Sequence, residues 1–248
     1  MRRFAITPEA VVGGRVTFDA SQSRHLARAL RLRPGDTIIA SDGSGRDYTV
    51  RLDAVGARVT GTIIGEATGG AAESPLAITL VQALPKSDKM ESIVRAATEL
   101  GVAAVQPAFT ARTVVRLSAS AALERAARWQ RVAREAAKQC GRRVVPVVAA
   151  PATLDVCLEA ARDSDLALCL WEANAPSLAS ALPDRPLRRA AVLIGPEGGL
   201  ETAEVDRARR AGWQVVNLGG RVLRTETAGP AVIAMLQARF GDLGTDGA

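Results

Sequence analysis

The sequence predicts an α/β fold, in which a domain built on a parallel sheet follows a smaller domain of β-strands. From residue 76 onward, continuous apolar stretches alternate with amphipathic ones, a pattern typical of a parallel sheet covered by helices on both faces. Before about residue 70, apolar and polar residues alternate over short stretches, as in an antiparallel barrel or sandwich. The Gly-rich stretch TGGAAESP at 68–75 reads as a linker. We therefore place one domain at 1–70 and a second at 71–248.

The first domain contains four candidate strands and one insertion. The strands are RVTFD, DTIIAS, DYTVRLDAV and RVTGTIIG, with Gly and Asp turns between them. The insertion at 21–36 carries Leu26, Ala29 and Leu30 at helical spacing and ends at a Pro-Gly turn. It also holds the four arginines of 24–33, so a basic surface is expected there.

The second domain alternates strands and helices along its length. The candidate strands are 76–84, 102–108, 144–149, 166–171, 190–195 and 214–219. The candidate helices are 88–100, 121–139, 201–211 and 226–240. In such a sheet, ligands bind at the carboxyl ends of the strands, in the loops that enter the next helix.

The charge of the chain indicates a polyanionic partner. The formal net charge is +6, and residues 86–143 carry twelve Lys or Arg against five Asp or Glu. A basic face for nucleic acid explains this excess, but solvated helix faces explain it equally well.

Membrane and metal chemistry find no support in the sequence. No apolar run approaches the roughly 20 residues of a membrane span, and the basic start lacks the apolar region of a signal peptide. Cys140, Cys157 and Cys169 lie far apart without CxxC spacing, which predicts neither a metal site nor disulfides. We expect a cytoplasmic protein whose cysteines pack in the core or between helices.

Two Gly-bearing loops are the candidate functional site. The first, GPEGG at 195–199, follows an apolar strand and precedes a helix, so its backbone could approach a ligand closely. A tight turn without a ligand is the alternative. The loop matches neither GxGxxG nor GxxxxGK[ST], which removes the usual support for a nicotinamide-dependent dehydrogenase or a nucleotide hydrolase.

The second loop lies in GRVLRTETAGPAVIAML, at the entry to the last helix. Thr225 or Thr227 is expected to be the N-cap of that helix. Capping does not explain Arg221 and Arg224, which flank the apolar Val222 and Leu223. The two loops are therefore expected to form the walls of one pocket.

These motifs together resemble the RsmE family, the bacterial methyltransferases that modify N3 of uridine 1498 in 16S ribosomal RNA. LIGPEGGL and LGGRVLRTETA form its paired signature. Three further stretches match in the same order: RHLARALRLRPGD, ALPKSDKMESIVRAATELGV and WQRVAREAAKQCGRRVVP. The resemblance thus covers most of the chain.

The resemblance implies a SPOUT-type α/β domain with a trefoil knot, preceded by a PUA-like barrel that helps to hold RNA. It also implies a homodimer and S-adenosylmethionine as the cofactor. Its cofactor-binding residues would come from the two loops and from the end of an earlier strand. They are Leu170, Gly195, Pro196, Glu197, Gly198, Gly199, Leu218, Gly219, Leu223, Thr225, Thr227 and Ala228.

For the methyl transfer, we expect Arg221 or Arg224 to stabilise the negative charge that spreads over O2 and O4 as uracil N3 loses its proton. Phosphate binding or pairing with Glu226 is the alternative for both arginines. Glu226 is the candidate base, although Glu226 and Glu197 could instead bind the cofactor's ribose or cap a helix. His25, the only histidine, lies in the first domain and is expected to contact RNA or pack in the barrel.

Basic residues are expected to hold the RNA of the small ribosomal subunit. They are Arg2, Arg3, Arg24, Arg28, Arg31 and Arg33 in the first domain, extended by Lys86, Lys89, Arg142 and Arg143. Only 3% of the residues are aromatic, which favours recognition by shape and phosphate geometry over base stacking. The alternatives are a knotted methyltransferase for another RNA or for a ribose hydroxyl, and a non-catalytic RNA-binding assembly factor.

Overall fold

The structure, a computed structural model, describes residues 3–67, 73–172 and 175–245. The chain divides into two compact units. The first contains residues 1–72 together with 137–145, and the second contains 73–136 and 146–248. Segment 137–145, from the middle of the chain, thus belongs to the first unit.

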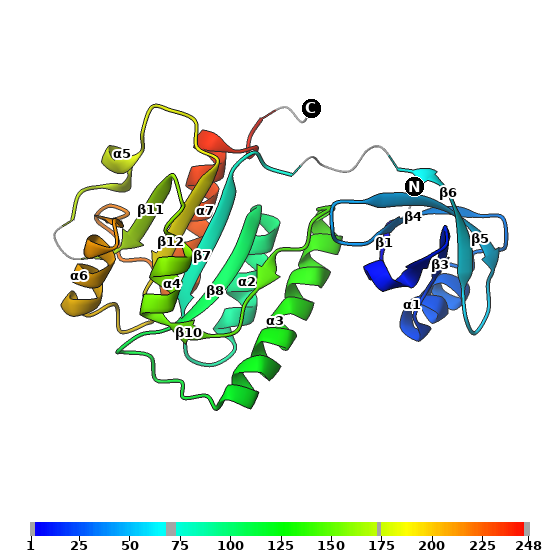
Figure 1. Cartoon of the computed structure of the whole chain (residues 1–248), viewed down its shortest axis with the longest axis horizontal. Coiled ribbons are helices and arrows are strands. Elements are labelled where there is room, and N and C mark those ends of the chain that lie inside the picture. Colours follow the sequence, from blue (N-terminus) through cyan, green and yellow to red (C-terminus); the bar gives the residue numbers. More distant parts are fainter. Residues whose placement is uncertain (1–2, 68–72, 173–174, 246–248) are drawn as a thin grey trace. The chain divides into compact units, whose positions relative to one another are not determined.

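The first unit is built on one six-stranded sheet (Figure 1). In spatial order, its strands are β1 (Arg3–Ala5), β4 (Thr37–Ser41), β5 (Asp47–Ala54), β6 (Thr60–Glu66), β3 (Arg15–Thr17) and β2 (Val11–Val12). All neighbours pair antiparallel except β1 and β4, which run parallel, so the expectation of a purely antiparallel arrangement was wrong at this edge. Phe18, Leu26, Ile38 and Leu52 are buried in its core. A short 3-10 turn, η1 (Pro8–Ala10), precedes β2.

The predicted helical insertion is present in this unit. It forms α1 (Ala20–Arg24) and a π-helical turn, η2 (His25–Ala29). Asp19 caps α1 by accepting a hydrogen bond from the backbone N–H of Gln22. Leu26 is fully buried, which anchors the insertion to the core while the arginines stay outside.

A buried carboxylate ties segment 137–145 to the sheet. Asp47 lies at the start of β5 with a fully buried side chain, and it pairs with Arg3 at 2.9 Å and Arg143 at 3.5 Å. Arg3 also donates to the carbonyl oxygen of Gly141 at 2.9 Å. Two guanidinium groups compensate the desolvation of one carboxylate, so the strand edge and this segment are held together.

The second unit is an α/β structure with a parallel sheet in the order β10-β8-β7-β12-β11-β13 and β9 paired to β8. Every recorded strand pair in it is parallel. The strands are β7 (Ala77–Ala83), β8 (Val102–Phe109), β9 (Val147–Val148), β10 (Ala152–Thr153), β11 (Leu166–Leu170), β12 (Arg189–Ile194) and β13 (Gln214–Val216). Apolar runs such as LALCL and AAVLI build the central strands, as a sheet covered on both faces requires.

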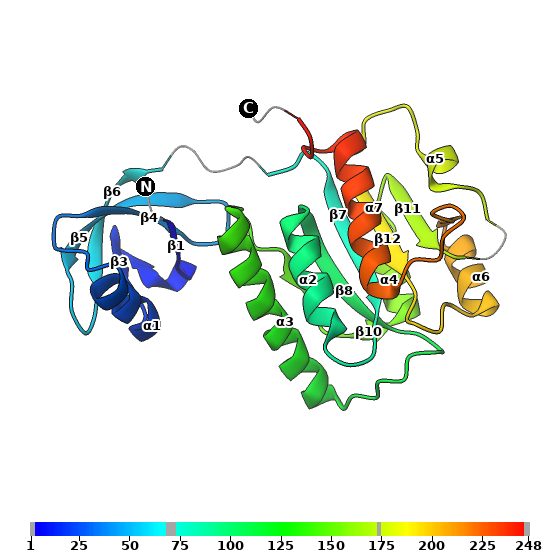
Figure 2. The same cartoon turned by 180° about the vertical axis from the view of Figure 1, so that it is seen from behind.

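Helices cover both faces of this sheet (Figures 1 and 2). α2 (Lys89–Glu99) and α7 (Thr225–Phe240) pack together on one face, and α4 (Leu154–Ala160) and α6 (Thr202–Arg210) on the other. The remaining helices are α3 (Ala119–Cys140) and α5 (Leu178–Ala181). β7, β12 and β11 are central strands, so the loops that leave them lie between these layers.

Several predicted boundaries were wrong. The strand expected at 144–149 is only Val147–Val148, and the one expected at 214–219 ends at Val216. The helices α4 and α5 and the strand β10 were not predicted. They contain seven, four and two residues, which is too few for a periodic pattern to be recognised.

The cysteines and the helices were also compared with the expectations. Cys157 and Cys169 are buried, whereas Cys140 is exposed at the end of α3, so its expected packing role was wrong. Among the described residues, no helix is both long and apolar enough to cross a membrane. The same residues contain no cluster of three or more His, Cys, Asp or Glu side chains that could hold a metal.

Candidate active site

A pocket lies where β11, β12 and β13 end, at the carboxyl edge of the second unit's sheet. Its volume is about 230 Å³. Residues 170–172 follow β11, residues 194–196 and 199–200 follow β12, and residues 217–223 follow β13; Thr225 and Ala228 of α7 complete the lining. The two Gly-bearing loops therefore lie on one pocket, at the position where open α/β sheets bind ligands.

The structure brings most of the predicted pocket residues together. Those that line it are Leu170, Gly195, Pro196, Gly199, Leu218, Gly219, Arg221, Leu223, Thr225 and Ala228. Five predicted site residues are not among the lining residues, namely Glu197, Gly198, Arg224, Glu226 and Thr227.

Sequence reasoning missed several lining residues. They are Trp171, Glu172, Ile194, Leu200, Asn217, Gly220 and Val222. Trp171 and Glu172 come directly after β11, a central strand, so the rule that ligands bind at strand ends would have found them. Arg209 lies over the ring of Trp171, with the guanidinium carbon 5.7 Å from the ring centroid, which stacks α6 against this wall.

The GPEGG loop folds tightly back on itself. A Cβ atom at Gly195 would lie 3.1 Å from the backbone nitrogen of Leu200, closer than an ordinary contact. Gly199 has a φ of +71°, and a Cβ there would lie 2.8 Å from Oε1 of Glu172. Both glycines are thus needed for the shape of this wall, and the Glu172 carboxylate lies directly against it.

Asn217 holds the second wall. Its backbone N–H donates to the carbonyl oxygen of Pro176 at 2.9 Å, and its own carbonyl accepts from Leu178 at 2.8 Å. The Asn217 side chain donates to the carbonyl of Ala175 and accepts the backbone N–H of Gly219 at 3.0 Å. The glycine loop therefore starts from a fixed point, and the φ of +99° at Gly219 then turns the chain.

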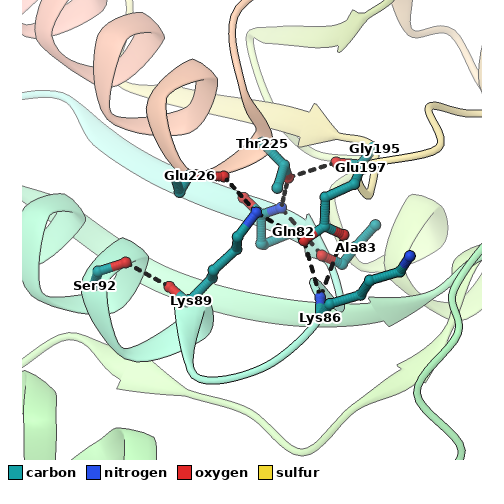
Figure 3. A network of polar contacts seen from close by, with 9 residues as sticks. All are labelled: Gln82, Ala83, Lys86, Lys89, Ser92, Gly195, Glu197, Thr225 and Glu226. Carbon is teal, nitrogen blue, oxygen red and sulfur yellow. Dashed lines mark hydrogen bonds and ion pairs between the residues drawn. The ribbon is translucent and has the colours of Figure 1, made fainter.

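Thr225 joins three segments beneath the pocket (Figure 3). Its buried hydroxyl donates to the carbonyl oxygen of Gly195 at 2.7 Å and accepts from Nε2 of Gln82 at 2.9 Å. The expectation that Thr225 or Thr227 caps α7 was wrong, since the N-cap residue is Arg224 and it makes no side-chain capping hydrogen bond. The threonine hydroxyl is used for tertiary contacts instead.

Lys89 lies between the two candidate carboxylates (Figure 3). Its Nζ is 3.0 Å from Oε1 of Glu197 and 3.2 Å from Oε2 of Glu226. Glu197 also accepts the backbone N–H of Lys86, at 3.1 Å to Oε1. One ammonium therefore links the first residues of α2, the GPEGG loop and the first turn of α7.

These contacts determine the protonation of the cluster. Hydrogen bonds to Glu197 and Glu226 raise the pKa of Lys89. Burial raises the pKa of Glu197, but hydrogen bonds from its own amide and from Lys89 outweigh it and leave the pKa lowered. The Glu226 amide, followed by Lys89, lowers the pKa of Glu226 despite burial. All three groups are charged at neutral pH.

The two candidate catalytic arginines differ in position. Arg221 lines the pocket with an exposed side chain. Arg224 is exposed at the N-cap of α7, outside the lining. The ion pair recorded for Glu226 is with Lys89 and not with either arginine, although the nearby charge of Arg224 contributes to the lowered pKa of Glu226.

The candidate RNA-contacting residues fall into three groups. Arg24, His25, Arg28, Arg31 and Arg33 are exposed along α1, η2 and the following turn, and the His25 ring lies 6.3 Å from that of Phe4. Lys86 is exposed, whereas Lys89 and Arg3 are engaged with carboxylates and Arg142 is partly buried within segment 137–145. Arg2 lies outside the described residues.

Comparison with known proteins identifies the family of this chain. Residues 72–237 match the family model of an RNA methyltransferase domain, and residues 18–58 match that of an RNA methyltransferase PUA domain. The ribosomal RNA small subunit methyltransferase E of a Synechocystis strain is 37% identical over 95% of this chain and 77% of its own length. The chain belongs to the ribosomal RNA small subunit methyltransferase E family.

Solved structures support the membership in this family. The ribosomal RNA small subunit methyltransferase E of Neisseria gonorrhoeae, bound to S-adenosyl methionine, aligns with a TM-score of 0.86 and 36% identity, covering 98% of this chain and 99% of its own. A Legionella pneumophila methyltransferase with bound S-adenosylmethionine aligns with a TM-score of 0.85 and 30% identity, covering 97% and 98%. The fold of the family, a PUA-like domain followed by an α/β methyltransferase domain, is thus the fold of this chain. Nothing in these comparisons tests the trefoil knot, which stays a prediction.

Proposed function

We propose that this protein transfers a methyl group from S-adenosylmethionine to N3 of a uridine in 16S ribosomal RNA, at position 1498 and within the small ribosomal subunit. The observation that carries the proposal is the pocket that the two Gly-bearing loops enclose at adjoining strand ends. The matching family models and the relatives' names supply the substrate class.

The pocket suits this cofactor. Leu170, Leu200 and Leu223 offer apolar surface for an adenine ring, and the Gly195 and Gly199 backbone leaves room that a side chain would fill. Glu172 and Asn217 add polar groups at the same walls, suited to hydroxyl or ammonium groups. We assign cofactor binding to these residues and to the predicted lining residues; when bound, the cofactor supplies the methyl group.

Arg221 is the proposed catalytic residue. As N3 loses its proton to water, negative charge spreads over O2 and O4 of uracil, and a guanidinium at the pocket would stabilise that charge more than the neutral base. Glu226 is a poor base by comparison, since Lys89 holds its carboxylate and its pKa is lowered. Arg224, at the mouth of α7, is proposed to hold the RNA backbone.

Substitution of the two arginines separates these roles. R221A is expected to lower kcat by at least about tenfold with little change in RNA affinity, because it removes charge stabilisation in the transition state. R224A is expected to weaken RNA binding with kcat largely retained. Single-turnover rates and filter binding on small subunits measure both, and normal turnover in R221A would remove its catalytic role.

The RNA partner and the assembly complete the proposal. We assign RNA contact to the exposed arginines at 24–33 and to Lys86, and we place the PUA-like domain at 1–70 and the methyltransferase domain at 71–248. We further propose a trefoil knot in the second domain, a homodimer and a cytoplasmic location, where small subunits are found. Sedimentation equilibrium of the purified protein would test the dimer.

One experiment tests the reaction and its substrate together. Purified protein is incubated with isotopically labelled S-adenosylmethionine and small subunits that lack the modification, and the labelled nucleoside is identified by mass spectrometry. We expect 3-methyluridine at the stated position. A different labelled nucleoside would keep the methyltransferase and change its target, and cofactor binding without any label would favour a non-catalytic assembly factor.

A further inference from the structure

The strongest unexplained feature of the second unit is the three-way ion pair at Lys89. The ammonium contacts Glu197 at 3.0 Å and Glu226 at 3.2 Å, and all three side chains are between 24% and 33% exposed. None of the three lines the pocket. The cluster is therefore outside the ligand space yet attached to both loops that enclose it.

The connectivity of the cluster gives it a mechanical role. Glu197 lies between Pro196 and Gly198 in the first loop, so a contact at its side chain acts directly on that wall. Glu226 follows Thr225, which lines the pocket and binds the carbonyl of Gly195. Lys89 starts α2, which packs against α7. Lys89 thus connects the first wall and the helix after the second wall through a third, rigid element.

The ion pair also removes a repulsion. Both carboxylates lie at contact distance from one ammonium, so they are close to each other as well. Without a positive charge between them they would repel, and this would push the GPEGG loop away from the start of α7. The hydrogen bond between Thr225 and Gly195 would then have to hold the two walls alone.

We propose that Lys89 is a positioning residue that keeps the cofactor pocket closed by holding Glu197 and Glu226 together. This inference rests on the proposed function, because it concerns the same pocket. It reassigns Lys89 from RNA contact to pocket geometry, and it assigns Glu226 to the same cluster in place of proton transfer. Its effect should appear in cofactor affinity even when no RNA is present.

The chain offers a matched control at Lys86. Lys86 is exposed, and its contact with Glu197 uses only the backbone N–H, while its side chain extends away from Glu197 (Figure 3). K86M and K89M therefore remove the same charge from the same short segment, but only K89M breaks the ion pair. K89R retains the charge and serves as the conservative variant.

Calorimetry with S-adenosylhomocysteine and the full-length protein provides the measurement. We expect K89M to raise the Kd by roughly fivefold to tenfold, whereas K86M stays within about twofold of the wild type and K89R lies in between. Far-UV circular dichroism and the melting midpoint verify that each variant is folded. If K89M does not fold, E197Q/E226Q tests the same cluster with Lys89 in place and should raise the Kd similarly.

Two further readouts separate positioning from a general loss of stability. In the E197Q/E226Q background, K89M should change the Kd by less than about twofold, because the groups it holds are no longer charged. The charged groups facing the cluster are Lys86, Lys89, Arg224 and the two carboxylates. In K89M, lowering the pH from 8 toward 5 should restore affinity as a carboxylate is protonated, while the wild type should change little.

The outcomes are decisive for the proposal. Unchanged affinity in K89M, equal losses in K89M and K86M, or an undiminished effect of K89M in the E197Q/E226Q background would each overturn it. A K89M variant that binds S-adenosylhomocysteine normally but RNA weakly would return Lys89 to the RNA surface. Failure of the wild type to bind S-adenosylhomocysteine would reject the proposed function itself, which is distinguishable from a normal wild type and an unaffected variant.

Discussion

Thr225 is the residue on which the largest number of buried polar contacts near the pocket converge. Its hydroxyl serves Gln82 and the carbonyl of Gly195, both of which lie far away in the sequence. Gln82 is fully buried, so removal of the hydroxyl would leave a donor and an acceptor without this partner. A threonine that looks like a helix cap in the sequence is therefore a tertiary contact.

Replacement of this threonine should destabilise the second unit. T225V keeps the volume but loses the hydroxyl, and we expect the free energy of unfolding to fall by about 1–3 kcal/mol. Thr227, exposed two residues further along α7, provides the control, and T227V should change stability by no more than about 0.5 kcal/mol. Urea unfolding monitored by circular dichroism measures both, and equal effects would mean that the hydroxyl contacts contribute nothing.

The three cysteines should differ sharply in reactivity. Burial raises the pKa of Cys157 to about 11 and that of Cys169 to about 12, so almost no thiolate forms at pH 8. Cys140 is exposed. With Ellman's reagent at pH 8, we expect one thiol to react quickly in the folded protein and all three after denaturation. Loss of the fast phase in C140S would assign it, and three fast thiols in the folded protein would contradict the burial of β11 and α4.

The strand β6 contains two glycines in very different surroundings. A Cβ at Gly61 would lie 2.5 Å from Cγ1 of Val50 and 2.7 Å from the carbonyl oxygen of Arg51, on the neighbouring strand β5. A Cβ at Gly65 would meet nothing within 4 Å. The pairing of β5 and β6 is irregular between Leu52 and Ala54, and Gly61 pairs with Leu52 at that point. Close approach of two backbones thus requires glycine at one position of the strand only.

Alanine substitutions in β6 test this close approach. G61A should lower the free energy of unfolding of the first unit by about 1–3 kcal/mol, because the obstacle includes backbone that cannot rotate away. G65A should be nearly neutral and is the matched control within the same strand. Chemical unfolding of the two variants measures the difference. If G61A were as stable as G65A, the strands β5 and β6 would have to be further apart than described.

Elements were predictable where the pattern was long. The apolar runs of β7, β8, β11 and β12 and the amphipathic α2, α3 and α7 show strand and helix periodicity over enough residues. The contacts of Lys89 were not predictable, since its partners lie more than 100 residues away in the sequence and a surface lysine shows no local sign of them. Glycines that mark the pocket walls were visible, but the buried polar contacts behind them depend on the tertiary fold.

The whole molecule carries its charge unevenly, and this leads to the last prediction. The net charge is +6, and the arginines at 24, 28, 31 and 33 are all exposed on one insertion whose apolar side is anchored by Leu26. If the insertion contacts RNA phosphates, each arginine that does so releases counterions and steepens the dependence of affinity on salt. A general attraction by net charge would not depend on where the arginines lie.

A pair of fourfold variants distinguishes these possibilities. R24Q/R28Q/R31Q/R33Q should weaken binding to small subunits and reduce the slope of log affinity against log salt by up to about 3. The control R162Q/R185Q/R188Q/R210Q removes the same four charges from exposed sites of the second unit, so both variants have the same net charge. We expect the control to retain most of the slope, as filter binding over a KCl series would show. Equal loss in both variants would mean that overall charge, and not this insertion, attracts the RNA.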